Sequence, residues 1–131
     1  MKSKLFGLYD CVCNQMCRIP GIKFAAIINK HGKKIVGGFG SQVTPFEKDD
    51  KKIEMLSMEI ALDLSMRKEF DNSLGRIRAI ISYREKANVI TVPHEDNLML
   101  ISSETELDPL KVVQIAYDNL APVKIMEVAA H

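Results

Sequence analysis

The sequence predicts an α+β fold in which three helices pack on a five-stranded antiparallel sheet, in the order α-β-β-α-β-β-β-α. Apolar residues recur at helical spacing in residues 3–18, 47–70 and 108–122. Runs typical of strands occur twice before the middle helix and three times after it. The chain has 131 residues, of which 47% are hydrophobic, so it can bury a core, and we expect one domain over residues 1–131.

The first half of the chain is predicted to form a helix and then a β hairpin. Residues 3–18 place apolar side chains on one helical face and stop at a Pro-Gly pair. Residues 22–28 are almost continuously apolar, as in a strand covered on both faces. Residues 29–32 supply a turn, and residues 35–39 return as the second strand. Glycines weaken the end of this strand, so we expect a bulge or bend at Gly37, Gly38 and Gly40.

The second half is predicted to form three strands and a helix. Residues 77–84 alternate between apolar and polar side chains, and residues 89–92 and 98–101 are shorter apolar runs. A polar turn is expected over residues 93–97. The last helix starts at an Asp-Pro pair, which suits an N-cap followed by the first helical position, and it is expected to end near residue 122.

Strand composition predicts the order of the sheet. The first and fifth strands are the most apolar and should be interior, whereas the glycine-weakened second strand and the alternating third strand should be edges. An order of 2-1-5-4-3 meets both conditions. Residues 79–83 of the third strand carry no proline, lysine or inward charge, so this edge lacks the usual protection against pairing with another strand.

The long helix predicted over residues 47–70 carries two apolar stripes on opposite sides. At about 100° per residue, one face collects Ile53, Leu56, Ile60 and Leu64, and the opposite face collects Met55, Met58, Leu62 and Met66. A helix packed on its own domain needs only one such stripe. The second stripe therefore predicts a protein interface, with cover by the termini of the same chain as the alternative.

Charge and hydropathy exclude several classes of partner. The chain has 18 Lys and Arg against 17 Asp and Glu, a formal net charge of +1, which argues against nucleic-acid binding. The apolar stretch near the N-terminus is interrupted too early for a signal peptide or membrane span, so we expect no membrane partner. The cysteines lie in one short segment and do not form a disulfide framework, which favours the cytoplasm; they are Cys11, Cys13 and Cys17.

No pattern of residues indicates a catalytic, metal or cofactor site. His94, Glu95 and Asp96 could ligate a cation, but a solvated hairpin loop explains them without one. The glycines of the second strand lack the Gly-Lys-Ser/Thr ending of a phosphate-binding loop. We therefore expect a protein that is not an enzyme, and structural rather than catalytic thiols.

The predicted order of elements resembles the roadblock family of dynein light chains and their prokaryotic relatives, within the profilin-like and longin-like group. The likeness is clearest over residues 77–101, which include Val89-Ile90-Thr91-Val92-Pro93 and a second run from Asp96 to Ile101, and in the turn at residues 29–32. The resemblance implies a homodimer or heterodimer that serves as a platform or regulator for small Ras-like GTPases, or as an adaptor in larger assemblies; for this chain we expect the homodimer.

In such a dimer the third strands pair edge to edge and the long helices pack together on one face of the continuous sheet, with the terminal helices on the other. The matching positions here are Met55, Met58, Leu62 and Met66 on the helix, and Arg78, Ala79, Ile80, Ile81, Ser82 and Tyr83 on the strand.

Two other functions stay open from the sequence. A small-molecule sensor of profilin-like or PAS-like architecture would need a cavity with converging polar groups, for which Tyr83, Thr91 and Ser102 are scattered candidates. A thiol-dependent enzyme would need at least one strongly acidic cysteine.

Overall fold

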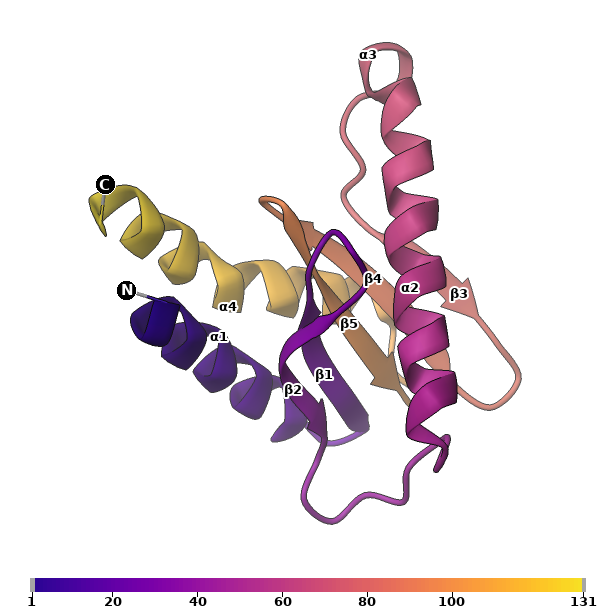
Figure 1. Cartoon of the computed structure of the whole chain (residues 1–131). Coiled ribbons are helices and arrows are strands. Elements are labelled where there is room, and N and C mark those ends of the chain that lie inside the picture. Colours follow the sequence, from indigo (N-terminus) through magenta and orange to yellow (C-terminus); the bar gives the residue numbers. More distant parts are fainter. Residues whose placement is uncertain (1, 131) are drawn as a thin grey trace.

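A computed structural model describes residues 2–130 of the chain, and side chains are described for residues 4–123. The elements follow the predicted order (Figure 1): α1 (Lys2–Cys17), β1 (Ile22–Ile28), β2 (Lys34–Phe39), α2 (Asp50–Arg67), the 3-10 turn η1 (Lys68–Phe70), α3 (Asp71–Leu74), β3 (Ile80–Tyr83), β4 (Asn88–His94), β5 (Asn97–Ser103) and α4 (Pro109–Ala130). Helix α2 begins later than predicted because the Asp49 carboxylate caps it, accepting a hydrogen bond from the backbone N–H of Lys51.

The five strands form one antiparallel sheet in the order β2-β1-β5-β4-β3, which confirms the predicted order. The interior strands β1 and β5 are buried along almost their whole length. Both edges are short, and β3 pairs with β4 over four residues only. Among the described residues, the outer edges of β2 and β3 have no neighbouring strand.

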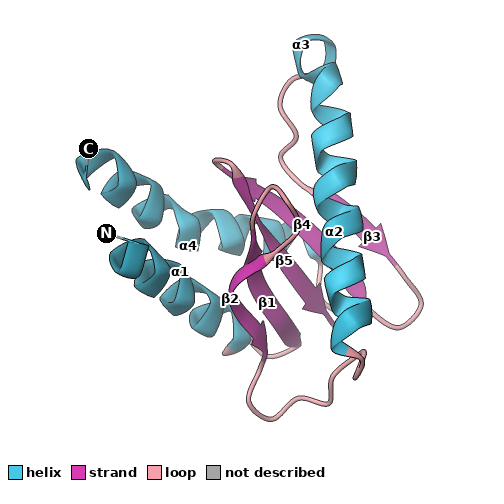
Figure 2. Ribbon diagram, in the orientation of Figure 1, coloured by secondary structure: helices cyan, strands magenta, loops and turns pink. Residues whose placement is uncertain are grey.

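Helices cover both faces of the sheet (Figure 2), and the side chains of the strands alternate between the two faces. Helix α2 lies on one face, and α1 with α4 on the other. Along β1, Ala25 and Ile27 pack under α1 and α4, whereas Phe24, Ala26 and Ile28 pack under α2. The side facing the terminal helices holds the larger core, built around fully buried residues such as Tyr9, Met16, Ile90, Met99 and Leu120.

Strand β3 begins at Ile80 rather than at residue 77, and Pro93 explains the difference. The pairing of Ile80 with Thr91 would place Arg78 opposite Pro93 if β3 continued. At this pair the backbone carbonyl of Arg78 would accept a hydrogen bond from the backbone N–H of residue 93. Proline has no N–H to donate, so the pair cannot form. The Arg78 carbonyl instead accepts a hydrogen bond from the Tyr117 hydroxyl of α4. Pro93 itself stays in β4, opposite Leu98, which was expected to follow a longer turn.

Two other expectations are corrected. The irregularity of the β1–β2 hairpin lies between Ile27 and Ile28, near its turn, whereas Gly37 and Gly38 remain paired within β2. Helix α4 also runs past Pro122 to Ala130 instead of ending there. Pro122 is exposed, so the carbonyl that loses its helical hydrogen bond can be hydrated, and the helix tolerates the proline.

Candidate interaction surface

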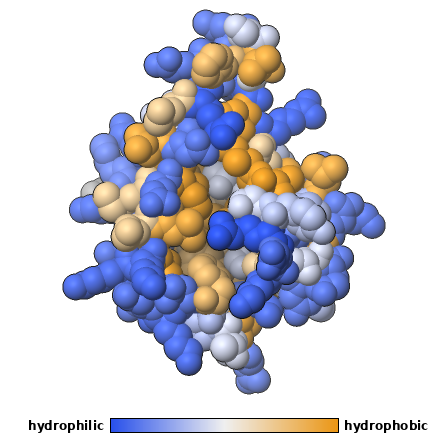
Figure 3. Space-filling view, turned by 90° about the vertical axis from the view of Figure 1, so that its right-hand side faces the viewer, coloured by the Kyte–Doolittle hydropathy of each residue, from blue (hydrophilic) through white to orange (hydrophobic). Residues whose placement is uncertain are grey.

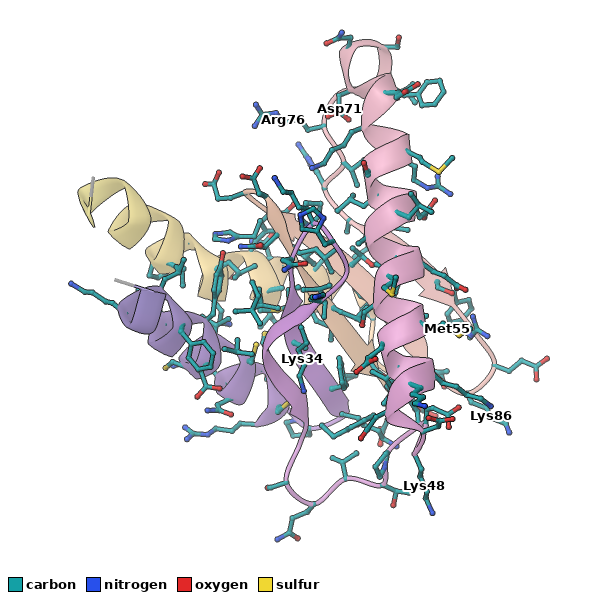
Figure 4. All side chains as sticks on the ribbon, viewed as in Figure 1. Lys34, Lys48, Met55, Asp71, Arg76 and Lys86 are labelled. Carbon is teal, nitrogen blue, oxygen red and sulfur yellow. The ribbon has the colours of Figure 1, made fainter. Side chains whose placement is uncertain are left out.

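The outer side of α2 is an apolar surface in contact with solvent. We call Met55, Met58, Leu62 and Met66 the methionine stripe; their side chains are 58–64% exposed. Met55 points away from the sheet and from α1 and α4 (Figure 4). Apolar residues lie among charged ones on the face seen from this side (Figure 3). Because α1 and α4 lie on the opposite face of the sheet, the described parts of the termini do not cover the stripe.

Helix α2 is anchored to the sheet by few side chains. Only Ser57, Ala61 and Leu64 are buried, and two of these three are small. The Ser57 hydroxyl is satisfied within the helix, because it donates to the Ile53 carbonyl at 3.0 Å. Ile53, Leu56, Ile60 and Leu64 were predicted as the inward stripe, and Ile53, Ile60 and Leu64 do pack in the smaller core. Helix α2 thus packs its inward stripe against the sheet and leaves the methionine stripe exposed to solvent.

The apolar surface continues beyond the predicted stripe. Phe70 in η1 is 59% exposed and Leu74 at the end of α3 is 82% exposed. Sequence reasoning missed both residues because it ended the stripe at residue 66. The available signal was the spacing of four residues that runs from Leu62 through residues 66, 70 and 74.

The β3 edge is the second candidate surface. Arg84 donates to the Ala87 carbonyl across the turn at 3.1 Å. Since hydrogen-bonded pairs alternate along an antiparallel ladder, Ile80 and Ser82 bond to β4, whereas Ile81 and Tyr83 direct their N–H and C=O groups outward. Tyr83 is 76% exposed. Of the six strand positions predicted for pairing, Ile80 to Tyr83 lie in β3, and Arg78 and Ala79 precede it.

A hollow of about 730 Å³ separates α2 from the β3–β4 turn. Ile53 and Leu56 form its wall on the helix, and Tyr83 and Val89 form its wall on the strands. Its other lining residues are mostly charged: Glu47, Lys52, Arg84, Glu85 and Lys86. The position of Leu56 in this hollow shows which flank of α2 faces β3. Ala61 and Ser65, on the other flank, line a hollow with Lys30 and His31 of the β1–β2 turn.

Two of the three cysteines, Cys13 and Cys17, have thiols that are buried or partly buried. Cys11 is exposed and Cys13 buried, while Cys17 is intermediate. Burial, with Cys17 and Asp10 nearby, raises the pKa of the Cys13 thiol from its usual 9.0 to about 12. Burial also raises the pKa of Cys17. A catalytic thiol needs the opposite shift, so these two thiols lack the acidity that a thiol-dependent enzyme requires.

The raised pKa of Cys13 predicts how stability changes in alkali. Between pH 9 and pH 12 the folded chain keeps the Cys13 proton and the unfolded chain loses it, so the free energy of unfolding falls as pH rises, by up to about 1.4 kcal/mol per pH unit. Urea unfolding at pH 8, 9 and 10 measures this slope. Cys13→Ala should have a shallower slope than the wild type; an identical slope would contradict the assignment.

His94 is not the solvated loop residue that the sequence indicated. It is the last residue of β4 and is only 8% exposed, and its Nδ1 lies 2.7 Å from the Tyr9 hydroxyl of α1. Asn97 also donates to that hydroxyl, at 3.4 Å. The turn consists of Glu95 and Asp96 alone. Among the described residues, no three His, Cys, Asp or Glu side chains are grouped so that they could hold a metal ion.

Within the described part of the chain, every helix is too short or too polar to cross a bilayer.

Comparison with solved structures shows the fold. The chain is similar to a roadblock/LC7 domain from Streptomyces avermitilis, with 10% sequence identity and a TM-score of 0.70 over 91% of this chain and 97% of that one. It is also similar to the gliding protein MglB from Thermus thermophilus, with 13% identity and a TM-score of 0.73 over 91% and 90% of the two chains. A third similar structure is MglB in a tetrameric arrangement, with 15% identity and a TM-score of 0.74 over 95% and 92%.

Comparison by sequence shows the family. No curated protein matches the chain at a significant level. One family model, described as a family of unknown function (DUF6659), matches residues 3–123. Because this match spans most of the chain, the protein belongs to the DUF6659 family, and it has the roadblock fold.

Proposed function

We propose that this protein is a non-enzymatic interaction module that associates with itself and then presents a composite surface to another protein. The observation that carries the proposal is the methionine stripe, which is apolar and exposed on a helix that already has a buried face. The unprotected edge of β3 is a second surface that is open to association. The interface residues are those of the stripe and the strand positions from Arg78 to Tyr83.

The free energy of burying apolar surface supports association of two copies through the stripe. Fully burying a side chain of this size contributes about 1.5–3 kcal/mol, and roughly three-fifths of each is exposed. Two copies that cover each other's stripe would gain about 7–14 kcal/mol, against an association cost of about 4–15 kcal/mol. Burial of the stripe alone therefore comes close to offsetting the cost of association. Strand pairing or further apolar contacts would then determine whether the copies associate stably. Methionine suits such a surface because its unbranched side chain repacks easily.

The resemblance to roadblock domains suggests the class of the further partner, which is a small Ras-like GTPase. The role of this chain would be positional: two copies create one platform, and the partner docks on residues from both. The tetrameric arrangement of one structural neighbour is compatible with a fold that assembles through more than one surface.

Strand pairing is tested by removing one outward donor of β3. Tyr83→Pro deletes the outward N–H and keeps the hydrogen bonds of Ser82 to β4. Two bonds are lost per symmetric pair, so we expect association to weaken about 30-fold or more, measured by sedimentation velocity. Tyr83→Ala, which keeps the N–H, is the matched control. Equal weakening by both variants would show that the side chain, rather than strand pairing, matters.

The small-molecule sensor is not favoured. The hollow of about 590 Å³ beside Pro93 has many charged residues in its lining: Lys68, Asp71, Arg76, Arg78, Glu95 and Asp96. A ligand pocket is usually apolar with a few converging polar groups. Of the candidate ligand residues, Thr91 and Ser102 are buried within the sheet, and Tyr83 lies on its edge.

A further inference from the structure

The methionine stripe and the β3 edge face different directions. Ser57 and Leu64 mark the side of α2 that rests on the sheet. At about 100° per residue, Met55, Leu62 and Met66 lie about 160–180° from Leu64 around the helix. These three residues therefore point away from the sheet, as Met55 does in Figure 4, and Met58 lies closer to the β1–β2 turn, at about 120° from Leu64. The β3 edge points sideways, in the plane of the sheet.

The flank of α2 on the β3 side is charged rather than apolar. Leu56 marks this flank, because it lines the hollow beside β3. Between Leu56 and the methionine stripe, the helix carries Lys52, Glu59 and Asp63. Arg67 follows on the same flank and pairs with Asp63 at 2.9 Å. Two α2 helices brought side by side would thus meet through these charges.

One two-fold axis cannot bury both surfaces. Two β3 strands that pair antiparallel in a continuous sheet are related by an axis perpendicular to that sheet. Such an axis leaves both α2 helices on the same face, with both methionine stripes still directed into solvent. Strand pairing therefore brings the two stripes onto one side of the dimer without covering either of them.

We propose that the methionine stripe is a second, separate self-association surface, and that two strand-paired dimers stack through it to form a tetramer. This inference rests on the proposed self-association and divides it into two contacts. The occupant of the stripe is the stripe of another copy of this chain, related by its own two-fold axis.

The stripe is self-complementary about Leu62. Met58 and Met66 each lie four residues from Leu62, so an antiparallel pairing centred there places Met58 against the partner's Met66. Phe70 extends the apolar surface at the end of the helix. With about three-fifths of each side chain exposed, the stripe and Phe70 offer roughly 500 Å² per copy. Two copies would bury about 1,000 Å², which is the lower limit for a specific interface.

Sedimentation velocity of six proteins at micromolar concentrations tests the proposal. We expect the wild type to have the mass of four chains. Leu62→Glu should block stacking, and Tyr83→Pro should block strand pairing, so each should have the mass of two chains and their combination the mass of one. Ser65→Glu, an exposed α2 position outside the stripe, and Tyr83→Ala are the controls and should remain tetrameric. Thermal unfolding checks that each variant is folded.

The outcomes separate this inference from the proposed function. If the wild type is a dimer, the tetramer is overturned while self-association stands. In that case, one interface uses both surfaces if each single variant is a monomer, and it uses one surface if only one variant is. A wild type unaffected by Leu62→Glu also overturns the stacking contact. A wild type that is a monomer overturns both proposals.

Discussion

Replacing Gly32 with alanine should destabilise the fold by about 3 kcal/mol or more. Gly32 closes the β1–β2 turn with a φ of +83°, a conformation that L-residues adopt at a cost. A Cβ at this position would lie 2.5 Å from the Cα of Met58 in α2. Backbone cannot yield as a flexible side chain can, so the turn or the helix must move. Urea unfolding of Gly32→Ala against the wild type measures the loss.

Gly75 provides a matched control for this prediction. Its φ is also +83°, and a Cβ there would meet no atom within 4 Å. Gly75→Ala should therefore cost only the backbone strain, about 1–3 kcal/mol. Equal losses for the two variants would mean that the close approach of the turn to α2 adds nothing. A larger loss of stability for Gly32→Ala would support the view that contact with the turn helps to fix the position of α2. The position of α2 in turn sets the direction of the methionine stripe.

Replacing Asn88 with aspartate should cost about 3 kcal/mol or more at pH 7. Asn88 is fully buried at the start of β4, opposite Tyr83. Its amide nitrogen donates to the carbonyls of Glu104 and Leu107, at 3.4 and 3.2 Å, and so holds the segment between β5 and α4. A carboxylate of the same shape would lose both hydrogen bonds and place a negative charge beside two carbonyl oxygens.

The pH dependence of Asn88→Asp identifies the cause. Burial favours the neutral acid, so the folded pKa of this aspartate should lie above its unfolded value, and the penalty should shrink as pH falls towards 4. Urea unfolding at pH 4 and pH 7, each compared with the wild type, measures this change. Asn72→Asp, at an exposed position in α3, should show almost no loss at either pH. A penalty of Asn88→Asp that is independent of pH would point to packing instead of charge.

The order of the strands in the sheet could be predicted because the composition of a strand indicates whether it lies inside the sheet or at an edge. β1 and β5 are apolar on both faces, and only interior strands need that pattern. The two stripes of α2 could be found for the same reason, since helical spacing separates residues that face the sheet from those that face solvent. The exposed stripe in the folded chain agrees with the surplus of apolar surface that the sequence indicated.

Other features depended on tertiary contacts that the sequence does not display. The start of β3 is set by Pro93, which lies opposite Arg78 only once the register of β3 and β4 is known. The burial of His94 depends on Tyr9, which is 85 residues away in the chain. The different directions of the methionine stripe and the β3 edge also required the fold, because spacing along a helix does not say where a strand edge points. For this reason the two surfaces were predicted as one interface.

Native mass spectrometry of the wild-type chain at micromolar concentrations tests self-association most directly. The exposed stripe and the unpaired β3 edge predict an assembly whose mass is a multiple of 14.7 kDa and that persists on dilution through this range. A single species of 14.7 kDa at every concentration, from a folded sample, would contradict the account.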